Sequence, residues 1–322
     1  MSKVKCAILG TGNIGTDLLM KIGRSELLEV GIFAGRRPDS DGMLKAKQLG
    51  IFTSTESIDA IVQNPELCDV VFDCTSASSH LVHAPILEDL GKFTIDLTPA
   101  HVGQFCVPVL NLSEGLKSKN VNMITCGGQA TIPILTAISD ALGGNLDYIE
   151  TVSVIASKSA GVGTRNNIDE FTQTTKQSIL DFTGCKQAKS IIILNPAEPP
   201  IRMHNTIYVP FTNPDMPTIT YAVNEMASKV REYVPGYRIA MQPIYENGNI
   251  TVGIEVNGAG DYLPKYSGNL DIINCAAVHI AEQYARSRSG VHPTLVGPAI
   301  NAGKAVINAG KADNNEGGVN NG

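Results

Sequence analysis

Residues 3–15 read KVKCAILGTGNIG, an apolar run that passes directly into three glycines at the spacing GxGxxG. The apolar run predicts a buried strand, and the spaced apolar residues of 16–24 predict a helix after it. In that context Gly10 permits the tight turn, Gly12 lets the backbone approach a pyrophosphate, and Gly15 lets the helix pack closely on the strand. The stretch therefore predicts a dinucleotide-binding fold, with phosphate at the start of the helix.

Outward from this loop, short apolar strands alternate with helical patterns as far as residue 125, which is typical of a parallel sheet covered on both faces. Strands rich in β-branched residues then follow, separated by helices near 168–180 and 217–233. We therefore predict an α/β protein. Residues 1–125 form a Rossmann-type, doubly wound parallel sheet, and residues 126–267 form a catalytic and dimerisation α+β domain with a mostly antiparallel sheet.

The end of the chain has a different composition. Residues 269–288 read NLDIINCAAVHIAEQYARSR and predict a long helix, which we expect to pack back on the first domain as part of a unit at 268–300. Residues 301–322 are rich in Gly, Asn and Ala, and this composition predicts a disordered tail.

Charge and composition exclude several classes of function. The 322 residues hold 25 Lys and Arg against 31 Asp and Glu, a net charge of −6, which argues against nucleic-acid binding. No apolar run approaches the ~20 residues that span a bilayer. The first strand follows the N-terminus directly, so we expect no secretory signal and no membrane association.

The seven cysteines are odd in number and nowhere spaced CxxC, which is typical of reduced thiols in a cytoplasmic protein. The histidines form one close pair, His80 and His83, with no cysteine or acidic residue beside it in the sequence. This pair is too weak a pattern for a ligand set, and we predict no metal site.

The end of the second predicted strand bears on the choice of cofactor. An acidic residue about 20 positions beyond the glycine loop normally accepts the ribose 2′-hydroxyl of NAD. Residues 35–39 instead read GRRPD, and Arg36 can accommodate a 2′-phosphate or simply face water. NAD is the first expectation, and NADP stays open.

Residues 121–133 read VNMITCGGQATIP and place Cys126 between a strand and a helix that we expect to begin near Pro133. The positive end of a helix lowers the pKa of a nearby thiol, and Gly127 and Gly128 leave N–H groups accessible to an oxyanion. Free cysteine is most often a small buried apolar residue, and that alternative stays open at this point.

Beside a nicotinamide, the same thiol has one coherent chemistry. The thiolate of Cys126 adds to an aldehyde, and hydride transfer then leaves a thioester on the enzyme. Water, phosphate or another thiol could release the acyl group, and these residues do not choose among them.

Over residues 3–287 the chain resembles the acylating acetaldehyde dehydrogenases of aromatic meta-cleavage pathways. The resemblance is carried by GTGNIGTDL (10–18), DCTS (73–76), IDLTPA (95–100), NMITCGGQATIP (122–133), ASKSAGVGTRNNIDEFT (156–172), LNPAEPP (194–200), YVPGYR (233–238) and YSGNLDI (266–272). It implies a semialdehyde-dehydrogenase-like fold that converts acetaldehyde or short homologues, CoA and NAD to acyl-CoA and NADH. It also implies a complex with a 4-hydroxy-2-oxovalerate aldolase in aromatic hydrocarbon catabolism. We further expect a homodimer or larger oligomer.

The resemblance also implies the site residues. The acyl-thioester cysteine falls on Cys126. The cofactor contacts fall on Thr11, Gly12, Asn13, Ile14, Ser159, Ala160, Gly161, Val162, Gly163, Thr164, Arg165, Asn166, Asn167 and Asn269.

One departure from the family pattern concerns the acid/base. Family members commonly have Met-Arg-Asp-Thr where residues 203–206 read MHNT, and that aspartate is the suggested proton-transfer partner of the cysteine. Asn205 cannot take a proton, although it can orient a thiol or water. His204 could substitute as the acid/base or orienting group, since histidine is a common proton carrier, but neighbouring residues in a strand point to opposite faces.

Two alternatives stay open. A phosphorylating semialdehyde dehydrogenase shares the cysteine and the two-domain plan but passes the acyl group to phosphate. A cofactor-binding scaffold that has lost catalysis is supported only by Asn205 in place of the aspartate.

Overall fold

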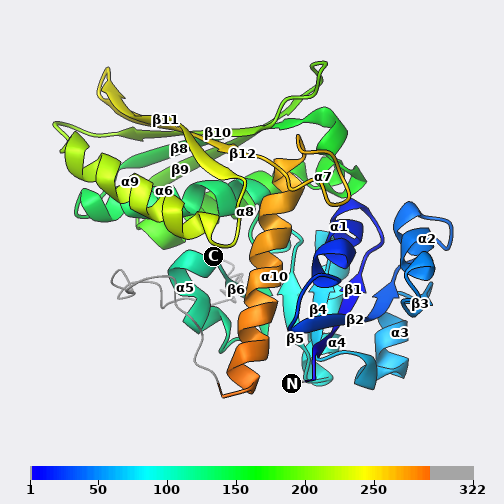
Figure 1. The fold of residues 1–322 in the computed structure, drawn as a ribbon. Helices are drawn as coiled ribbons and strands as arrows, with labels where there is room; N and C mark the ends of the chain where they lie inside the picture. Colours follow the sequence, from blue (N-terminus) through cyan, green and yellow to red (C-terminus); the bar gives the residue numbers. More distant parts are fainter. Residues whose placement is uncertain (1, 291–322) are drawn as a thin grey trace, which may run out of the picture.

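The structure is a computed structural model that describes residues 2–290. Two sheets, one of seven strands and one of five, form its framework (Figure 1). The elements up to residue 122 are β1 (Val4–Leu9), α1 (Asn13–Ile22), β2 (Leu28–Ala34), α2 (Asp41–Gln48), β3 (Thr53–Ser54), α3 (Ile58–Gln63), η1 (Pro65–Leu67), β4 (Val70–Asp73), α4 (Ala77–Asp89), β5 (Phe93–Asp96), β6 (Gln104–Phe105), α5 (Pro108–Gly115) and β7 (Asn120–Asn122).

The later elements supply the second sheet and its helices. They are α6 (Cys126–Ala141), β8 (Tyr148–Ala156), η2 (Ser157–Ser159), α7 (Val162–Asn166), α8 (Ile168–Thr183), β9 (Gln187–Asn195), β10 (Met203–Pro210), α9 (Met216–Arg231), β11 (Tyr237–Glu246), β12 (Asn249–Val256) and α10 (Gly268–Arg288). The expected tail at 301–322 and residues 291–300 lie outside the described residues.

The seven-stranded sheet has the order β3-β2-β1-β4-β5-β7-β6, and all of its strand pairs are parallel. This confirms the predicted doubly wound sheet. The strand order reverses between β1 and β4, and in such sheets ligands bind outside the carboxyl ends of the strands at that point. The glycine loop after β1 and the loop after β4 therefore flank the expected site.

The five-stranded sheet has the order β11-β12-β10-β8-β9. Its β8–β9 pair is parallel and its other pairs are antiparallel, so the sheet is mixed, with the antiparallel character that the sequence predicts. Helices α6, α8 and α9 lie on one face of it (Figure 1). Side chains alternate between this covered face and a half-exposed outer face, as the pattern of β8 shows.

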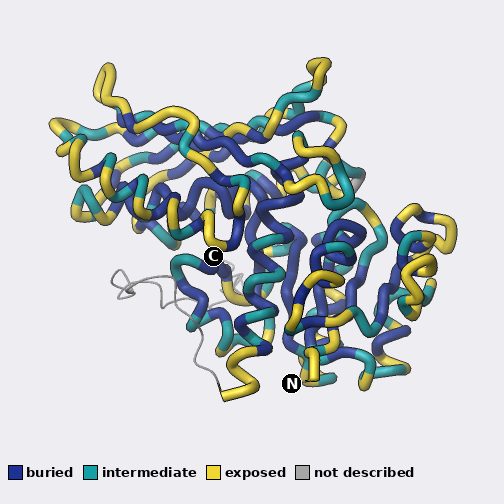
Figure 2. Tube along the Cα trace, viewed as in Figure 1, coloured by how far each residue is buried: buried dark blue, intermediate teal, exposed yellow. Residues whose placement is uncertain are grey.

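Helix α10, which ends near the last described residue, packs against α1 beside the seven-stranded sheet (Figure 1). Lys21 on α1 makes ion pairs of 2.6 Å with both Asp271 on α10 and Asp261 in the loop before it. Asn274 adds hydrogen bonds to the carbonyl of Ile14 and to Asp17. The buried part of the chain follows both sheets and the helices between them (Figure 2).

The start of α6 is the main difference from the sequence prediction. The helix begins at Cys126 rather than near Pro133, because the Thr125 hydroxyl caps it by accepting a 2.9 Å hydrogen bond from the Gly128 N–H. Pro133 lies inside the helix. Cys126 is therefore the first residue of α6 and not a residue of the preceding loop.

Candidate active site

The glycine loop has the close approaches that its sequence predicts. Gly10 has φ +105°, and a Cβ on it would lie 2.6 Å from the carbonyl oxygen of Cys74 after β4. A Cβ on Gly15 would lie 1.9 Å from the Gly10 carbonyl oxygen. Gly12, at the start of α1, has no neighbour within 4 Å of the corresponding position. The first and third glycines are thus required by the fold, and the second leaves open space in front of the helix.

A cavity of about 410 Å³ lies at the carboxyl ends of β2, β3 and β4. Its lining includes Arg36 after β2, Ser57 and Asp59 after β3, and Thr75 and His83 after β4. A dinucleotide with its pyrophosphate at α1 would place its adenosine half over these strand ends. Arg36 therefore lines the cavity that the adenosine ribose of such a dinucleotide would enter.

A distant segment that the resemblance assigns to the cofactor, residues 159–167, lies close to the glycine loop after β1. The Cβ position of Gly161 is 3.8 Å from the Asn13 amide, and that of Gly163 is 3.9 Å from the Thr75 carbonyl. The hydroxyl of Ser159 donates to the carbonyl of Ala156, and the guanidinium of Arg165 donates to the carbonyls of Ser157 and Ala160. These side-chain donors hold the 157–165 segment together, with Gly161 beside the glycine loop and Gly163 beside the loop after β4.

Asn269, the second residue of α10, is buried, and its Oδ1 has no hydrogen-bond partner among the described residues. The same end of α10 lies beside the first turn of α1, since Asn274 donates to the Ile14 carbonyl. A buried amide oxygen without a partner is costly unless a ligand or water pairs with it. This placement fits the cofactor contact expected for Asn269.

Cys126 is 9% exposed at the N-terminus of α6. Burial raises the pKa of its thiol to about 12, although the backbone N–H groups of Gly127 and Cys126 lower it. The sequence predicted a lowered pKa from the helix end alone. That expectation is wrong for the resting protein because burial disfavours the thiolate more than the helix end stabilises it.

Two buried polar side chains lie beside the first turn of α6 without partners. Asn205 on β10 is paired with Ser153 on β8 in the sheet, and both face the helices. Neither the amide of Asn205 nor the hydroxyl of Ser153 has a hydrogen-bond partner among the described residues. A Cβ on Gly127 would lie 2.6 Å from the Ser153 oxygen. Ser153 therefore lies directly against the residue after Cys126, and Asn205 is its neighbour on the adjacent strand.

His204 lies on the opposite face of the same strand. Its side chain is half exposed, and its Nε2 is 3.5 Å from Glu255 on β12. Because Asn205 is buried against the helices and strand neighbours alternate, His204 points away from α6. The suggested acid/base or orienting role of His204 is therefore inconsistent with the fold, whereas Asn205 is on the required face.

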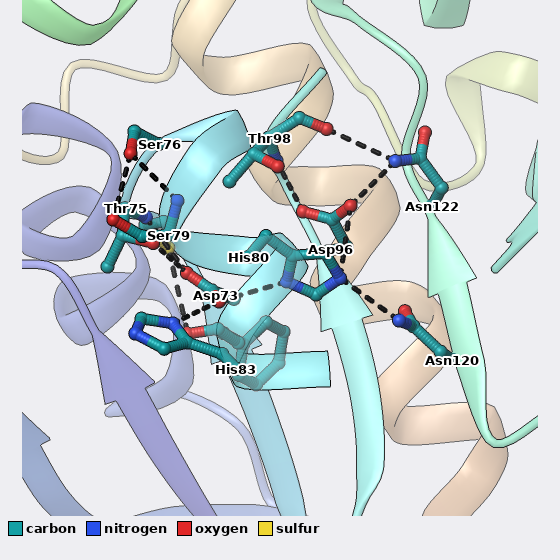
Figure 3. A network of polar contacts seen from close by, with 12 residues as sticks. Asp73, Thr75, Ser76, Ser79, His80, His83, Asp96, Thr98, Asn120 and Asn122 are labelled. Atoms are coloured by element: carbon teal, nitrogen blue, oxygen red, sulfur yellow. Dashed lines mark hydrogen bonds and ion pairs between the residues drawn. The ribbon is translucent and has the colours of Figure 1, made fainter. Parts of the chain in front are cut away.

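The sequence prediction missed a buried polar network beneath the strand ends (Figure 3). Asp73 at the end of β4 accepts hydrogen bonds from His80 and His83 of α4, at 2.9 and 2.8 Å. The other ring nitrogen of His80 is 3.3 Å from Asp96 at the end of β5. His80 and His83 form a close pair in the sequence, but Asp73 is at the end of β4 and Asp96 at the end of β5, so spacing alone could not reveal that both acids meet His80. No group of three or more such side chains between residues 2 and 290 is arranged to hold a metal ion.

Comparisons with known proteins agree with this arrangement. Residues 126–264 match the family described as prokaryotic acetaldehyde dehydrogenase, dimerisation. The chain is 51% identical over 284 residues to an acetaldehyde dehydrogenase of Spirochaeta aurantia, covering 88% of this chain and 95% of that protein. It is 54% identical over 290 residues to one of Geobacillus stearothermophilus, covering 89% and 98%.

Solved structures give the same fold at lower identity. An aspartate semialdehyde dehydrogenase from Candida albicans, solved with NADP, matches with a TM-score of 0.60 at 13% identity, covering 90% of this chain and 99% of that one. An aspartate semialdehyde dehydrogenase from Vibrio cholerae matches with a TM-score of 0.58 at 13% identity, covering 88% and 99%. These similarities confirm the predicted semialdehyde-dehydrogenase-like fold.

Proposed function

The chain belongs to the acetaldehyde dehydrogenase family, and we propose that it oxidises acetaldehyde with NAD and passes the acyl group from Cys126 to coenzyme A. One observation carries this proposal. The glycine loop, the 157–165 segment and the first turns of α10 lie close together, which supports one dinucleotide site in the chain that carries the Cys126 thiol at the start of α6.

The residues present fit a dinucleotide. Gly12 leaves room for a phosphate at the first turn of α1, Gly10 and Gly15 bring strand and helix together, and Asn269 offers an unpartnered acceptor. NAD, when bound, supplies the hydride acceptor. Arg36 lines the adenosine-side cavity and gives it a donor for a 2′-phosphate, so NADP use at a lower rate is compatible with the same site.

The first chemical step depends on groups around α6. The Cys126 sulfur adds to the aldehyde carbon, and the carbonyl oxygen becomes an oxyanion that needs hydrogen-bond donors. The N–H groups of Cys126 and Gly127 have no helical acceptors, whereas the N–H of Gly128, which the sequence predicted to be accessible as well, is bonded to the Thr125 cap. The Asn205 amide and the Ser153 hydroxyl are unpartnered donors nearby. Loss of hydride from this adduct to the bound cofactor would give the thioester of Cys126. Attack by the coenzyme A thiol would then transfer the acyl group to coenzyme A, and the proton of that thiol would go to the departing Cys126 sulfur.

The choice of acyl acceptor is tested directly. We expect acetaldehyde and NAD to yield NADH at a sustained rate when coenzyme A is present, with acetyl-CoA as the product seen by chromatography. We expect inorganic phosphate in its place to give no sustained rate. Turnover with phosphate and not with coenzyme A would favour the phosphorylating alternative and contradict the proposal.

A second prediction concerns Asn205, which cannot accept a proton. Because burial raises the pKa of Cys126 to about 12, the thiolate fraction grows tenfold per pH unit below that value, and we expect kcat/KM to rise with pH throughout the neutral and mildly alkaline range. Asn205→Asp adds a proton acceptor on the buried face, so its profile should level off above the pKa of the new carboxyl. NAD affinity, measured by calorimetry, should change by less than about twofold. Superimposable pH profiles would argue against a proton-transfer role at this position.

The outer face of the five-stranded sheet supports an oligomer. Val152 and Val154 of β8 lie beside Ile191 and Ile193 of β9 in register; the first three are partly exposed, and Ile193 is 44% exposed. The part of the chain that carries this sheet matches a dimerisation family. We propose that a second copy of the chain covers this face.

Some expectations remain predictions from the resemblance. They are the 4-hydroxy-2-oxovalerate aldolase partner, the place in aromatic hydrocarbon catabolism and the use of short homologues of acetaldehyde. The domain boundaries at 125 and 267 remain predictions from the strand and helix patterns. The cytoplasmic location is supported by seven cysteines that are all unpaired in the described residues. None of the helices described between residues 2 and 290 is both long and apolar enough to cross a membrane.

A further inference from the structure

The buried network around His80 joins the ends of three neighbouring strands (Figure 3). His80 and both of its acidic neighbours, Asp73 on β4 and Asp96 on β5, are fully buried. Nδ1 of His80 is 2.9 Å from Asp73, and Nε2 is 3.3 Å from Asp96. An imidazole that faces a carboxylate on each side can donate to both only when both nitrogens carry protons.

The hydrogen bonds around these groups fit a charged His80. Burial by itself would lower the pKa of His80, but the hydrogen bond to Asp73 and the charge of Asp96 raise it overall. Burial raises the pKa of Asp96 to about 7, although the charge of His80 and the hydrogen bonds from Thr98 lower it. Burial would likewise raise the pKa of Asp73, but hydrogen bonds from His80 and His83 lower it well below its ordinary value. The Asn120 amide lies 3.0 Å from His80 Nε2, and its Oδ1 has no other partner among the described residues. If the nitrogen and oxygen of the Asn120 side-chain amide exchange places, the oxygen becomes a second acceptor, beside Asp96, for a proton on His80 Nε2.

From Asp96 the network continues to the turn that precedes Cys126. Asp96 accepts a 2.7 Å hydrogen bond from the Asn122 amide at the end of β7. The oxygen of the same amide accepts a 2.7 Å hydrogen bond from the N–H of Ile124, which has φ +63°. A β-branched residue rarely adopts this left-handed conformation unless its surroundings impose it. Thr125, the cap of α6, and Cys126 follow immediately.

At its other end the network supports the cofactor side. Asp73 accepts hydrogen bonds from both the backbone N–H and the hydroxyl of Thr75, at 3.0 and 2.5 Å. Thr75 and His83 line the adenosine-side cavity, and the carbonyl of Cys74 packs against Gly10. Asp73 therefore fixes the loop after β4. His83 contacts Asp73 but not Asp96 among the described residues, so it supports the cofactor side of the network and not the Cys126 side.

We propose that His80, held as an imidazolium between Asp73 and Asp96, is a positioning residue that fixes the Ile124 turn through Asn122 and thereby holds Cys126 for reaction. The proposal rests on the proposed function, in which Cys126 is the nucleophile. The titratable groups that face His80 are Asp73 from β4 and Asp96 from β5, with His83 sharing Asp73 from the same helix.

The two histidines form a matched pair for the test. Both lie on α4 and donate to the same oxygen of Asp73, but only His80 reaches Asp96. His80→Gln should slow the alkylation of Cys126 by iodoacetamide about tenfold and lower kcat about tenfold. The alkylation rate is measured by mass spectrometry of the peptide that contains Cys126. Its NAD affinity should stay within about twofold of the parent. His83→Gln should weaken NAD binding and leave the alkylation rate of Cys126 within about twofold.

Several results would overturn the proposal. One is a folded His80→Gln protein whose Cys126 is alkylated at the parent rate, and another is an equal effect of the two variants on alkylation. Should His80→Gln fail to fold, nitrogen NMR of selectively labelled histidine in the wild-type protein still decides. We expect the spectrum at pH 7.5 to show one histidine, His80, with protons on both ring nitrogens. A His80 with only one protonated ring nitrogen at that pH would contradict the proposal. Because alkylation and NMR need no turnover, failure of the proposed activity would leave these readouts interpretable.

Discussion

Cys126→Ala is expected to abolish NADH formation from acetaldehyde, lowering kcat by at least about 10⁴-fold. The thiol is the only group at the start of α6 that can form a covalent bond to the aldehyde, and alanine leaves the first helical turn and the Thr125 cap in place. NAD should still bind with unchanged affinity, because the glycine loop and Asn269 are untouched. Steady-state assays of NADH absorbance with calorimetry of NAD binding separate these two effects.

A matched control is available in the same α+β region. Cys185 is also buried and unpaired, but it lies between α8 and β9, and its sulfur donates a hydrogen bond to the carbonyl of Gln187. Cys185→Ala should retain kcat within about twofold. A Cys126→Ala protein that keeps substantial turnover would show that the nucleophile is elsewhere, and it would favour a scaffold or a different catalytic thiol.

The glycine loop gives the second large effect, with opposite outcomes at two positions. Gly12 has φ −83°, which alanine adopts without strain, and no neighbour lies within 4 Å of its Cβ position. Gly12→Ala should therefore melt at the parent temperature yet bind NAD at least about tenfold more weakly, because the methyl group occupies the space for the pyrophosphate. Calorimetric titration and a thermal melt measure the two quantities.

Gly15→Ala should instead damage the fold. Its Cβ would lie 1.9 Å from the Gly10 carbonyl oxygen, and backbone cannot yield as a flexible side chain can. We expect a loss of about 1–3 kcal/mol in the free energy of unfolding, accompanied by loss of NAD binding. Equal melting temperatures for the two variants, or unchanged NAD affinity in Gly12→Ala, would contradict the assigned roles of these glycines.

The sequence predicted the architecture well because its signals are local. The apolar run before Gly10 and the GxGxxG spacing specify one strand, one turn and one helix, and the parallel sheet follows from repeats of that unit. The short elements β3 and β6 were missed, since strands of two residues carry no periodic pattern. The start of α6 was misplaced because Pro133 suggested a first turn, whereas the cap is the Thr125 side chain.

The site was predicted less completely because its properties depend on burial and on distant partners. The sequence identified Cys126, but burial makes its resting pKa higher than the helix end suggested. His204 and Asn205 are adjacent in sequence, so strand alternation predicts that they lie on opposite faces, but only the packing of β10 shows that Asn205 is the one that faces the helices. His80 depends on Asp96, and that contact exists only after β4 and β5 pair in the sheet.

The central claim is that the acyl group is carried by the sulfur of Cys126 during turnover. The most direct measurement mixes the protein with acetaldehyde and NAD without coenzyme A, quenches with acid, and maps the peptides by mass spectrometry. We predict one acetyl group on the peptide that contains Cys126. The acetyl group should form only when NAD is present, and it should be absent when coenzyme A is added before the quench. An unmodified Cys126 peptide, alongside NADH formed by a protein that turns over normally with coenzyme A, would contradict it.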